Sequence, residues 1–225
     1  MIPWEFRESV QVPGNGGTMC LYRRGGEYSI RVGNRELMNS RVHGSEEALA
    51  ELAYARVADR PQPRILIGGL GMGFTLAAAL RRLGPEGRVV LAELVPTVVE
   101  WNRGPLANLA GHPLKDSRVT VREVDVAQIL RGTREAYDAI LLDVDNGPEG
   151  LARKDNDWLY ARPGLEAAHA ALRPAGVLAV WSSGPNQVFV QRLRRVGFRV
   201  DEVRVSARDS RKGRRHTIWL AGRAT

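Results

Sequence analysis

The chain has 225 residues, a formal net charge of +8 at pH 7 and a single cysteine, Cys20. This length suits one domain with at most a small addition. A single cysteine excludes an internal disulfide bond, and because the four histidines are scattered we predict no metal site. No apolar run reaches the roughly 18 residues of a membrane span and the first residues do not resemble a signal peptide, so we expect a cytoplasmic protein without a membrane partner.

Short β-rich runs fill the first forty residues. They read ESVQV, TMCLY, EYSIRV and RELM, and glycine-rich turns separate them. The sequence therefore predicts a small antiparallel β appendage over residues 1–40. A helix should follow, because Ser45 precedes Glu46, Glu47 and apolar residues at helical spacing, with Ser45 as its cap and the acids at its positive end.

After residue 63, apolar strand-like runs alternate with helical patterns in five successive units. This alternation is typical of a parallel sheet covered by helices on both faces. The last two runs, FRVDEVRVS and HTIWLAG, have only a polar loop between them and should pair as an antiparallel hairpin at one edge. Residues 41–225 are therefore expected to form an α/β, Rossmann-like domain of the class I methyltransferase type, with a seven-stranded, mostly parallel sheet.

A glycine-rich turn provides the strongest local motif, because Gly69, Gly71 and Gly73 directly follow the buried strand RILIG and precede a helix. Glycines at this point let the backbone turn sharply and approach a ligand at the positive end of the helix. Glu93 ends the next strand 20 residues after Gly73, where a carboxylate accepts hydrogen bonds from both hydroxyls of a ribose.

Two further acids follow the same rule: Asp125 ends the third strand unit and Asp143 ends the fourth. Ligands of open α/β sheets bind at the carboxyl ends of the strands, so these acids and the glycine loop should line one crevice. Phe74 stands where a NAD-binding fingerprint has its third glycine, which favours an S-adenosyl ligand over NAD.

From about residue 35 to residue 220, the chain resembles the spermidine synthase (polyamine aminopropyltransferase) family. The stretches ILIGGLGMG, VVLAELVPTVVE, DSRVTVREVD and YDAILLDVDNGPEG are similar to the family's glycine loop, ribose-binding strand, adenine-contacting strand and catalytic loop. The resemblance implies a transferase that takes S-adenosylmethionine or its decarboxylated form as donor, and it implies a homodimer. It assigns Glu93 to the ribose, Asp125 to the adenine, and Asp143 or Asp145 to the catalytic base.

Three positions depart from the family pattern. Gly71 replaces the glycine-loop aspartate that the resemblance assigns to the amine of the decarboxylated donor, and Asn146 replaces an acid of the catalytic loop. The family's Tyr-His-Glu run aligns with residues 49–51, where only Glu51 matches. We therefore expect Glu51, Asn146 and Tyr160 to contact a small, amine-bearing acceptor, with a changed amine or donor.

Two alternatives stay open. A methyltransferase that uses intact S-adenosylmethionine fits the loss of the glycine-loop acid, which would repel the donor's carboxylate. A non-catalytic nucleoside- or nucleic-acid-binding protein is the other, because the segment 192–215 holds ten basic residues against three acidic ones. The segment from Asp143 to Asp157 has the opposite sign, with a net charge of −3, which favours a cationic acceptor.

Overall fold

A computed structural model of the chain describes residues 2–14, 16–144, 148, 157–207 and 215–225. The predicted N-terminal appendage is confirmed as a four-stranded antiparallel sheet with its strands in sequential order. Its strands are β1 (Glu5–Gln11), β2 (Thr18–Arg24), β3 (Glu27–Val32) and β4 (Arg35–Asn39).

The remainder is built on a seven-stranded sheet in the order β10-β11-β9-β8-β5-β6-β7. Its strands are β5 (Arg64–Gly68), β6 (Arg88–Ala92), β7 (Val119–Arg122), β8 (Tyr137–Leu142), β9 (Leu172–Ser182), β10 (Arg199–Ser206) and β11 (Arg215–Gly222). Neighbouring strands from β7 to β9 run parallel, whereas β11 is antiparallel to both β9 and β10. The predicted Rossmann-like sheet and terminal hairpin are therefore confirmed.

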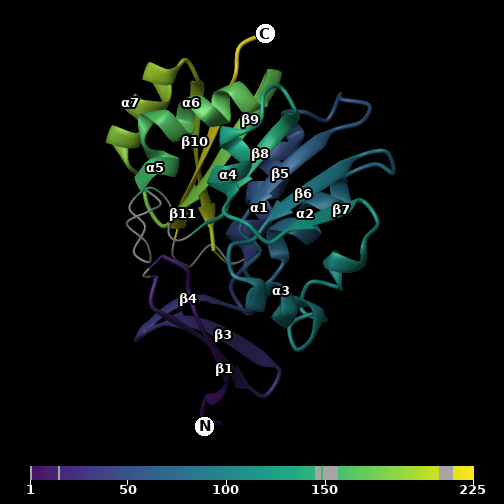
Figure 1. The fold of residues 1–225 in the computed structure, drawn as a ribbon, viewed down its shortest axis with the longest axis vertical. Helices are drawn as coiled ribbons and strands as arrows, with labels where there is room; N and C mark the ends of the chain where they lie inside the picture. The colour runs from purple at the N-terminus through teal and green to yellow at the C-terminus, as the bar shows by residue number, and fades with distance from the viewer. Residues whose placement is uncertain (1, 15, 145–147, 149–156, 208–214) are drawn as a thin grey trace.

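Helices cover both faces of this sheet (Figure 1). They are α1 (Gly44–Ala55), α2 (Phe74–Arg82), α3 (Pro96–Arg103), η1 (Pro113–Lys115), α4 (Val126–Arg131), α5 (Asp157–Tyr160), α6 (Arg162–Ala171) and α7 (Gln187–Val196). Side chains of successive strand residues point to opposite faces, so Ile65 and Ile67 pack with α1, α2 and α3 while Leu66 packs with α4 to α7. No helix among the described residues is long and apolar enough to span a membrane.

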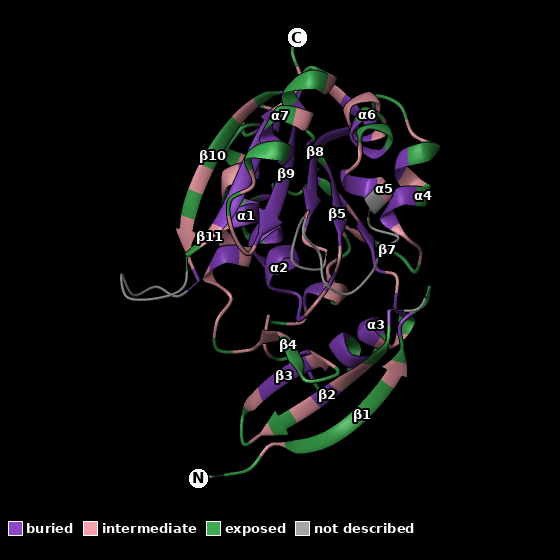
Figure 2. Ribbon diagram, turned by 90° about the vertical axis from the view of Figure 1, so that its left-hand side faces the viewer, coloured by how far each residue is buried: buried purple, intermediate pink, exposed green. Residues whose placement is uncertain are grey.

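The N-terminal sheet shares the hydrophobic core on the α1 to α3 side. Leu21 and Ile30 of its inner face are buried in that core, whereas β1 is mostly exposed (Figure 2). The indole Nε1 of Trp101 in α3 donates a hydrogen bond of 2.6 Å to Glu8 of β1. These contacts hold the small sheet against α3, where its strands β2 to β4 face the carboxyl ends of the parallel strands.

The start of α1 differs from the expectation. His43 is the N-cap residue and makes no side-chain cap bond, and Ser45 lies inside the first turn. The Ser45 hydroxyl instead lies 2.6 Å from the Glu46 carboxylate and 2.8 Å from Nδ1 of His216. The prediction that Ser45 caps the helix is therefore wrong, because its hydroxyl binds the carboxylate of the neighbouring Glu46 and the imidazole of His216 on β11.

Candidate functional site

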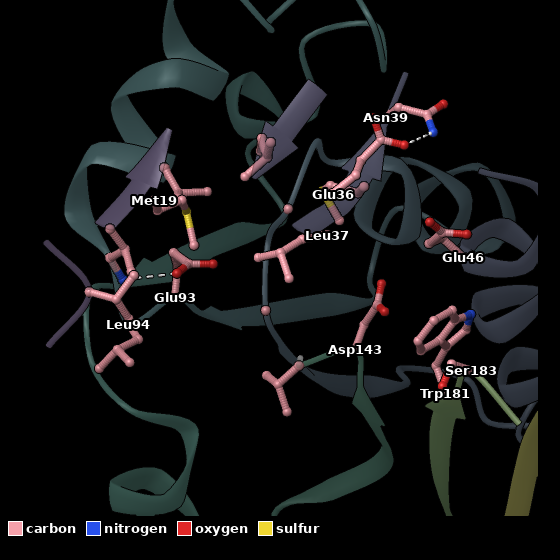
Figure 3. Close-up of a pocket in the computed structure, with 18 of the residues that line it drawn as sticks. Met19, Glu36, Leu37, Asn39, Glu46, Glu93, Leu94, Asp143, Trp181 and Ser183 are labelled. Atoms are coloured by element: carbon pink, nitrogen blue, oxygen red, sulfur yellow. Dashed lines mark hydrogen bonds between the residues drawn. The ribbon is translucent and has the colours of Figure 1, made fainter. Parts of the chain in front are cut away.

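A cavity of about 540 Å³ lies between the N-terminal sheet and the carboxyl ends of the parallel strands (Figure 3). Its volume falls in the range of small-molecule sites. Five carboxylates are among the described residues that line it: Glu36, Glu46, Glu93, Asp125 and Asp143. The only lysine or arginine among these described lining residues is Arg35. The charge of the cavity wall therefore favours a ligand that carries positive charge.

The glycine loop forms one wall of the cavity. Gly69 and Gly71 line it, with positive φ angles of 91° and 54° that side-chain-bearing residues rarely adopt. A Cβ atom at residue 69 would collide with the carbonyl oxygen of Asp143. Gly73, with a φ of 84°, is the N-cap of α2 and is not among the described lining residues. The three glycines thus set the turn between β5 and α2, and two of them face the cavity.

Glu93 lies directly after β6, where the sequence placed it. Its two carboxylate oxygens each accept a backbone hydrogen bond of 2.8 Å, from Leu70 of the glycine loop and from Val95 before α3. The residue is only 7% exposed and lines the cavity. The glycine loop therefore fixes this carboxylate at the cavity wall.

Asp125 has two roles in the structure. It is the N-cap of α4, where its carboxylate accepts a 2.9 Å hydrogen bond from the backbone N–H of Ala127. It also lines the cavity, beside Val126 and across the sheet edge from Glu93. The helix cap fixes the side chain at the site without removing it from the cavity wall.

Asp143 and Glu46 form the most strongly perturbed pair of acids in the described structure. The hydroxyl of Thr75 donates a 2.6 Å hydrogen bond to Asp143, but burial dominates and raises the pKa of this carboxyl to about 6. Burial, together with the charge of Asp143, raises the pKa of Glu46 to about 7. The two carboxyl groups interact and titrate as a pair, close to neutral pH.

An aromatic ring completes this part of the cavity. The indole of Trp181, at the end of β9, lies beside Glu46 and Asp143, and its Nε1 is buried without a hydrogen-bond partner (Figure 3). Carboxylates next to an aromatic face bind an organic cation through charge and through cation–π attraction. The arrangement fits a small ammonium group.

The structure brings together only part of the predicted substrate set. Glu51 is exposed on α1, pairs with Arg82 at 3.1 Å and is not among the cavity's described lining residues. Tyr160 is buried behind the wall, where its hydroxyl donates a 3.3 Å hydrogen bond to the carbonyl of Val144. Asp145, Asn146 and the tip of the basic segment at 208–214 lie outside the described residues.

Sequence reasoning missed Glu46, which lies five residues before Glu51 on α1 and enters the cavity in its place. The sequence signal was present, since Glu46 follows Ser45 in the first turn, but it was interpreted only as a helix-dipole interaction. Trp181 and His216 were missed as well, because neither stands in a motif. Among the described residues, no group of three or more His, Cys, Asp or Glu side chains is placed to hold a metal ion.

Comparisons with known proteins agree with this geometry. The model of the "Spermine/spermidine synthase domain" family matches residues 44–192. Putrescine N-methyltransferase 2 of Nicotiana attenuata is 38% identical over 120 residues, which cover 52% of this chain and 30% of that protein. The polyamine aminopropyltransferase of Oceanobacillus iheyensis is 31% identical over 170 residues, which cover 71% of this chain and 31% of that protein. The matches span about a third of the length of these curated relatives.

Solved structures share the fold at low sequence identity. Spermidine synthase from Thermotoga maritima superposes with a TM-score of 0.76 and 17% identity, covering 97% of this chain and 73% of that one. An O-methyltransferase family protein from Burkholderia thailandensis gives a TM-score of 0.54 and 18% identity, covering 80% of this chain and 55% of that one. These likenesses establish the methyltransferase-like architecture alone.

Proposed function

The chain belongs to the spermine/spermidine synthase family, and from that premise we propose that it transfers an alkyl group from an S-adenosyl sulfonium donor to a small cationic amine. The observation that carries the proposal is the acidic cavity, in which Glu46, Asp143 and Trp181 lie beside the glycine loop. Nucleoside-binding positions and a cation-binding pair thus share one enclosed space, as a two-substrate transfer requires.

The donor half of the site uses groups that the fold fixes in place. Glu93 accepts hydrogen bonds from the ribose hydroxyls, and Asp125 accepts one from the adenine amino group. The backbone of Gly69 and Gly71 lines the cavity beside the position proposed for the methionine-derived part of the donor. The donor supplies an electrophilic carbon on a sulfonium sulfur, and the protein holds that carbon facing the acceptor.

The acceptor half binds and deprotonates the amine. Asp143 and Glu46 attract the ammonium when they are ionised, and Trp181 provides an apolar wall against its methylenes. A base with a pKa near the working pH removes a proton most efficiently, and the raised pKa values of about 6 and about 7 meet that condition. Asp145 and Asn146 stay predicted contributors near this amine, while Tyr160 supports the cavity wall through its hydrogen bond to the Val144 carbonyl. The homodimer and the cytoplasmic location stay predictions.

A specific observation favours methyl transfer over aminopropyl transfer. The sulfur and terminal methyl of Met38 pack against Gly71, where the family pattern places an aspartate, so no carboxylate meets the amine of a decarboxylated donor at this position. Arg35, on the same strand β4, lines the cavity as a counterion for the carboxylate of an intact donor. The 38% identity to a putrescine N-methyltransferase supports the same choice.

Calorimetric titration tests the donor site, and product mass identifies the group transferred. We expect binding of S-adenosylmethionine and methylthioadenosine, and a gain of one methyl group when putrescine is added with S-adenosylmethionine. Failure to bind any S-adenosyl compound would contradict the transferase proposal. In a parallel reaction that supplies decarboxylated S-adenosylmethionine instead, a product larger by an aminopropyl group, with no methylated product from the intact donor, would leave the transferase proposal intact and overturn the choice of methyl transfer.

Restoring the family's acid tests the role of Gly71. Gly71→Asp places a carboxylate beside the donor chain, and the flexible end of Met38 can move to admit it. Aspartate tolerates a φ near 54° better than most residues do. We expect the affinity ratio to shift at least about tenfold toward decarboxylated S-adenosylmethionine. Gly71→Asn is the matched control, because it adds the same volume without the charge.

A further inference from the structure

A hydrogen-bonded chain of three side chains leads away from the acid pair. The Ser45 hydroxyl lies 2.6 Å from Oε2 of Glu46 and 2.8 Å from Nδ1 of His216. Ser45 is completely buried, whereas His216 on β11 reaches the cavity wall. Helix α1 supplies the first two groups and a strand 170 residues later in the chain supplies the third, so the contact depends on the tertiary fold.

The chemistry of a hydroxyl makes this chain reversible. A serine hydroxyl has one proton, so when it donates to ionised Glu46 its oxygen accepts a hydrogen bond from the Nδ1–H of His216. When Glu46 is protonated, it can donate to the serine oxygen while the serine proton turns to a neutral Nδ1 of His216. Both arrangements keep the two hydrogen bonds of Ser45, one to Glu46 and one to His216. They differ by the transfer of one proton between Glu46 and His216.

We propose that Ser45 and His216 form a proton relay that carries away the proton released by the acceptor amine. This inference rests on the proposed function. In the transfer, an ammonium and a sulfonium become an alkylated ammonium, a thioether and one free proton. Glu46, paired with Asp143, takes that proton. Ser45 passes its own proton to His216 and receives the one from Glu46, so that Glu46 returns to its ionised state, and the partly exposed His216 releases a proton to water.

The groups around His216 support this role. Glu46 and Asp143 supply negative charge from α1 and from the end of β8, which favours the imidazolium form. From β9 the edge of Trp181 packs against the imidazole with ring centroids 4.7 Å apart, and from β10 the partner position in the strand pair is the apolar Val205. Among these neighbours, Ser45 links His216 to Glu46.

Nuclear magnetic resonance titration of the histidine rings tests the coupling without any need for turnover. We expect the pKa of His216 to fall in Ser45→Ala and in Glu46→Gln, with the other three histidines unchanged. His216→Gln assigns the signal. An unchanged His216 titration in both variants would overturn the relay, and this outcome is independent of whether the chain transfers anything.

Turnover distinguishes a relay from simple positioning of Glu46. The amide of His216→Gln can still donate to Ser45 but cannot accept a proton, so a relay predicts that kcat falls about tenfold or more while methylthioadenosine affinity is unchanged. Full kcat in His216→Gln would overturn the proposal. His43→Gln is the matched control: His43 stacks on Phe74 with centroids 4.0 Å apart, outside the relay, and should retain wild-type kcat.

Discussion

The two halves of the cavity hold their carboxylates by different means. On the donor side, Glu93 and Asp125 accept hydrogen bonds from the backbone N–H groups of Leu70, Val95 and Ala127. On the acceptor side, Asp143 and Glu46 accept hydrogen bonds from the hydroxyls of Thr75 and Ser45. Backbone amides are fixed by the fold, whereas hydroxyls turn and exchange protons.

This difference separates recognition from chemistry. A carboxylate bound by backbone amides is oriented permanently, which suits the fixed pattern of hydroxyl and amino groups on a nucleoside. Burial and mutual repulsion raise the pKa of Asp143 and Glu46 toward neutral, so these two groups change protonation under working conditions. The comparison predicts that changes in the acceptor half affect turnover and pH dependence, and that changes in the donor half affect binding.

The largest expected effect comes from Asp143→Asn. The amide keeps the size of the side chain but removes the charge that orients the ammonium and that pairs with Glu46 during deprotonation, so kcat should fall by about 10² to 10⁴ while methylthioadenosine affinity stays within about twofold. Steady-state kinetics and calorimetry measure the two quantities. Asp59→Asn, at an exposed position before β5, is the control. Equal losses of binding and turnover in Asp143→Asn would contradict the division of the cavity.

The acid pair should also leave a signature in stability against pH. Unfolded, Glu46 releases its proton near pH 4.5; folded, it keeps that proton until about pH 7. Between these values the folded state binds more protons, so its contribution to the free energy of unfolding falls as the pH rises. At 1.4 kcal/mol per pKa unit, the loss is at most about 3 kcal/mol. Urea denaturation from pH 4 to 8 should show this fall, and it should be smaller in Glu46→Gln. An identical pH slope in the variant would contradict the burial of this acid.

Glu93→Ala is expected to weaken donor binding. The nucleoside loses a hydrogen-bonded charged partner, which corresponds to about 1 to 3 kcal/mol, or roughly 10- to 100-fold in the dissociation constant of methylthioadenosine. Glu123→Ala is the matched control, because Glu123 follows β7 but pairs with Arg103 at the surface. Thermal unfolding separates this effect from the loss of the bonds to Leu70 and Val95. Wild-type affinity in Glu93→Ala would exclude the ribose assignment.

The donor half could be predicted from sequence because each of its residues is placed by a pattern of neighbouring residues. Each parallel strand ends at the same edge of the sheet, so the residue after each strand reaches the crevice wherever the helices pack. Glu93 and Asp125 followed from this rule, as did Asp143 of the acceptor half, and the glycine loop followed from its position between a strand and a helix. The N-terminal sheet and the terminal hairpin were equally predictable, from alternating patterns and turn residues.

The acceptor half depends on packing that no local pattern encodes. Which face of α1 meets the cavity is decided by its contacts with α2 and with the sheet, so the sequence alone gave no reason to prefer Glu46 to Glu51. The contact of Ser45 with His216 joins positions 171 residues apart. Trp181 lies in β9, and its place beside the acid pair depends on the neighbouring strand β11. Ile218 of that strand is its register partner, and His216 of the same strand packs against its ring.

The smallest expected effect distinguishes these two glutamates. Glu51 makes an exposed ion pair with Arg82, and such pairs contribute little, so Glu51→Gln should change the free energy of unfolding by less than about 1 kcal/mol. Its putrescine affinity and kcat should equal those of the wild type, because its side chain points away from the cavity. The same substitution five residues earlier, Glu46→Gln, should weaken putrescine binding about tenfold, since it removes a charge beside the ammonium. If Glu51→Gln lowered putrescine affinity instead, Glu51 would contact the amine, as its alignment with the glutamate of the family's Tyr-His-Glu run implies. Helix α1 would then have to rotate by more than a third of a turn to bring that side chain to the amine.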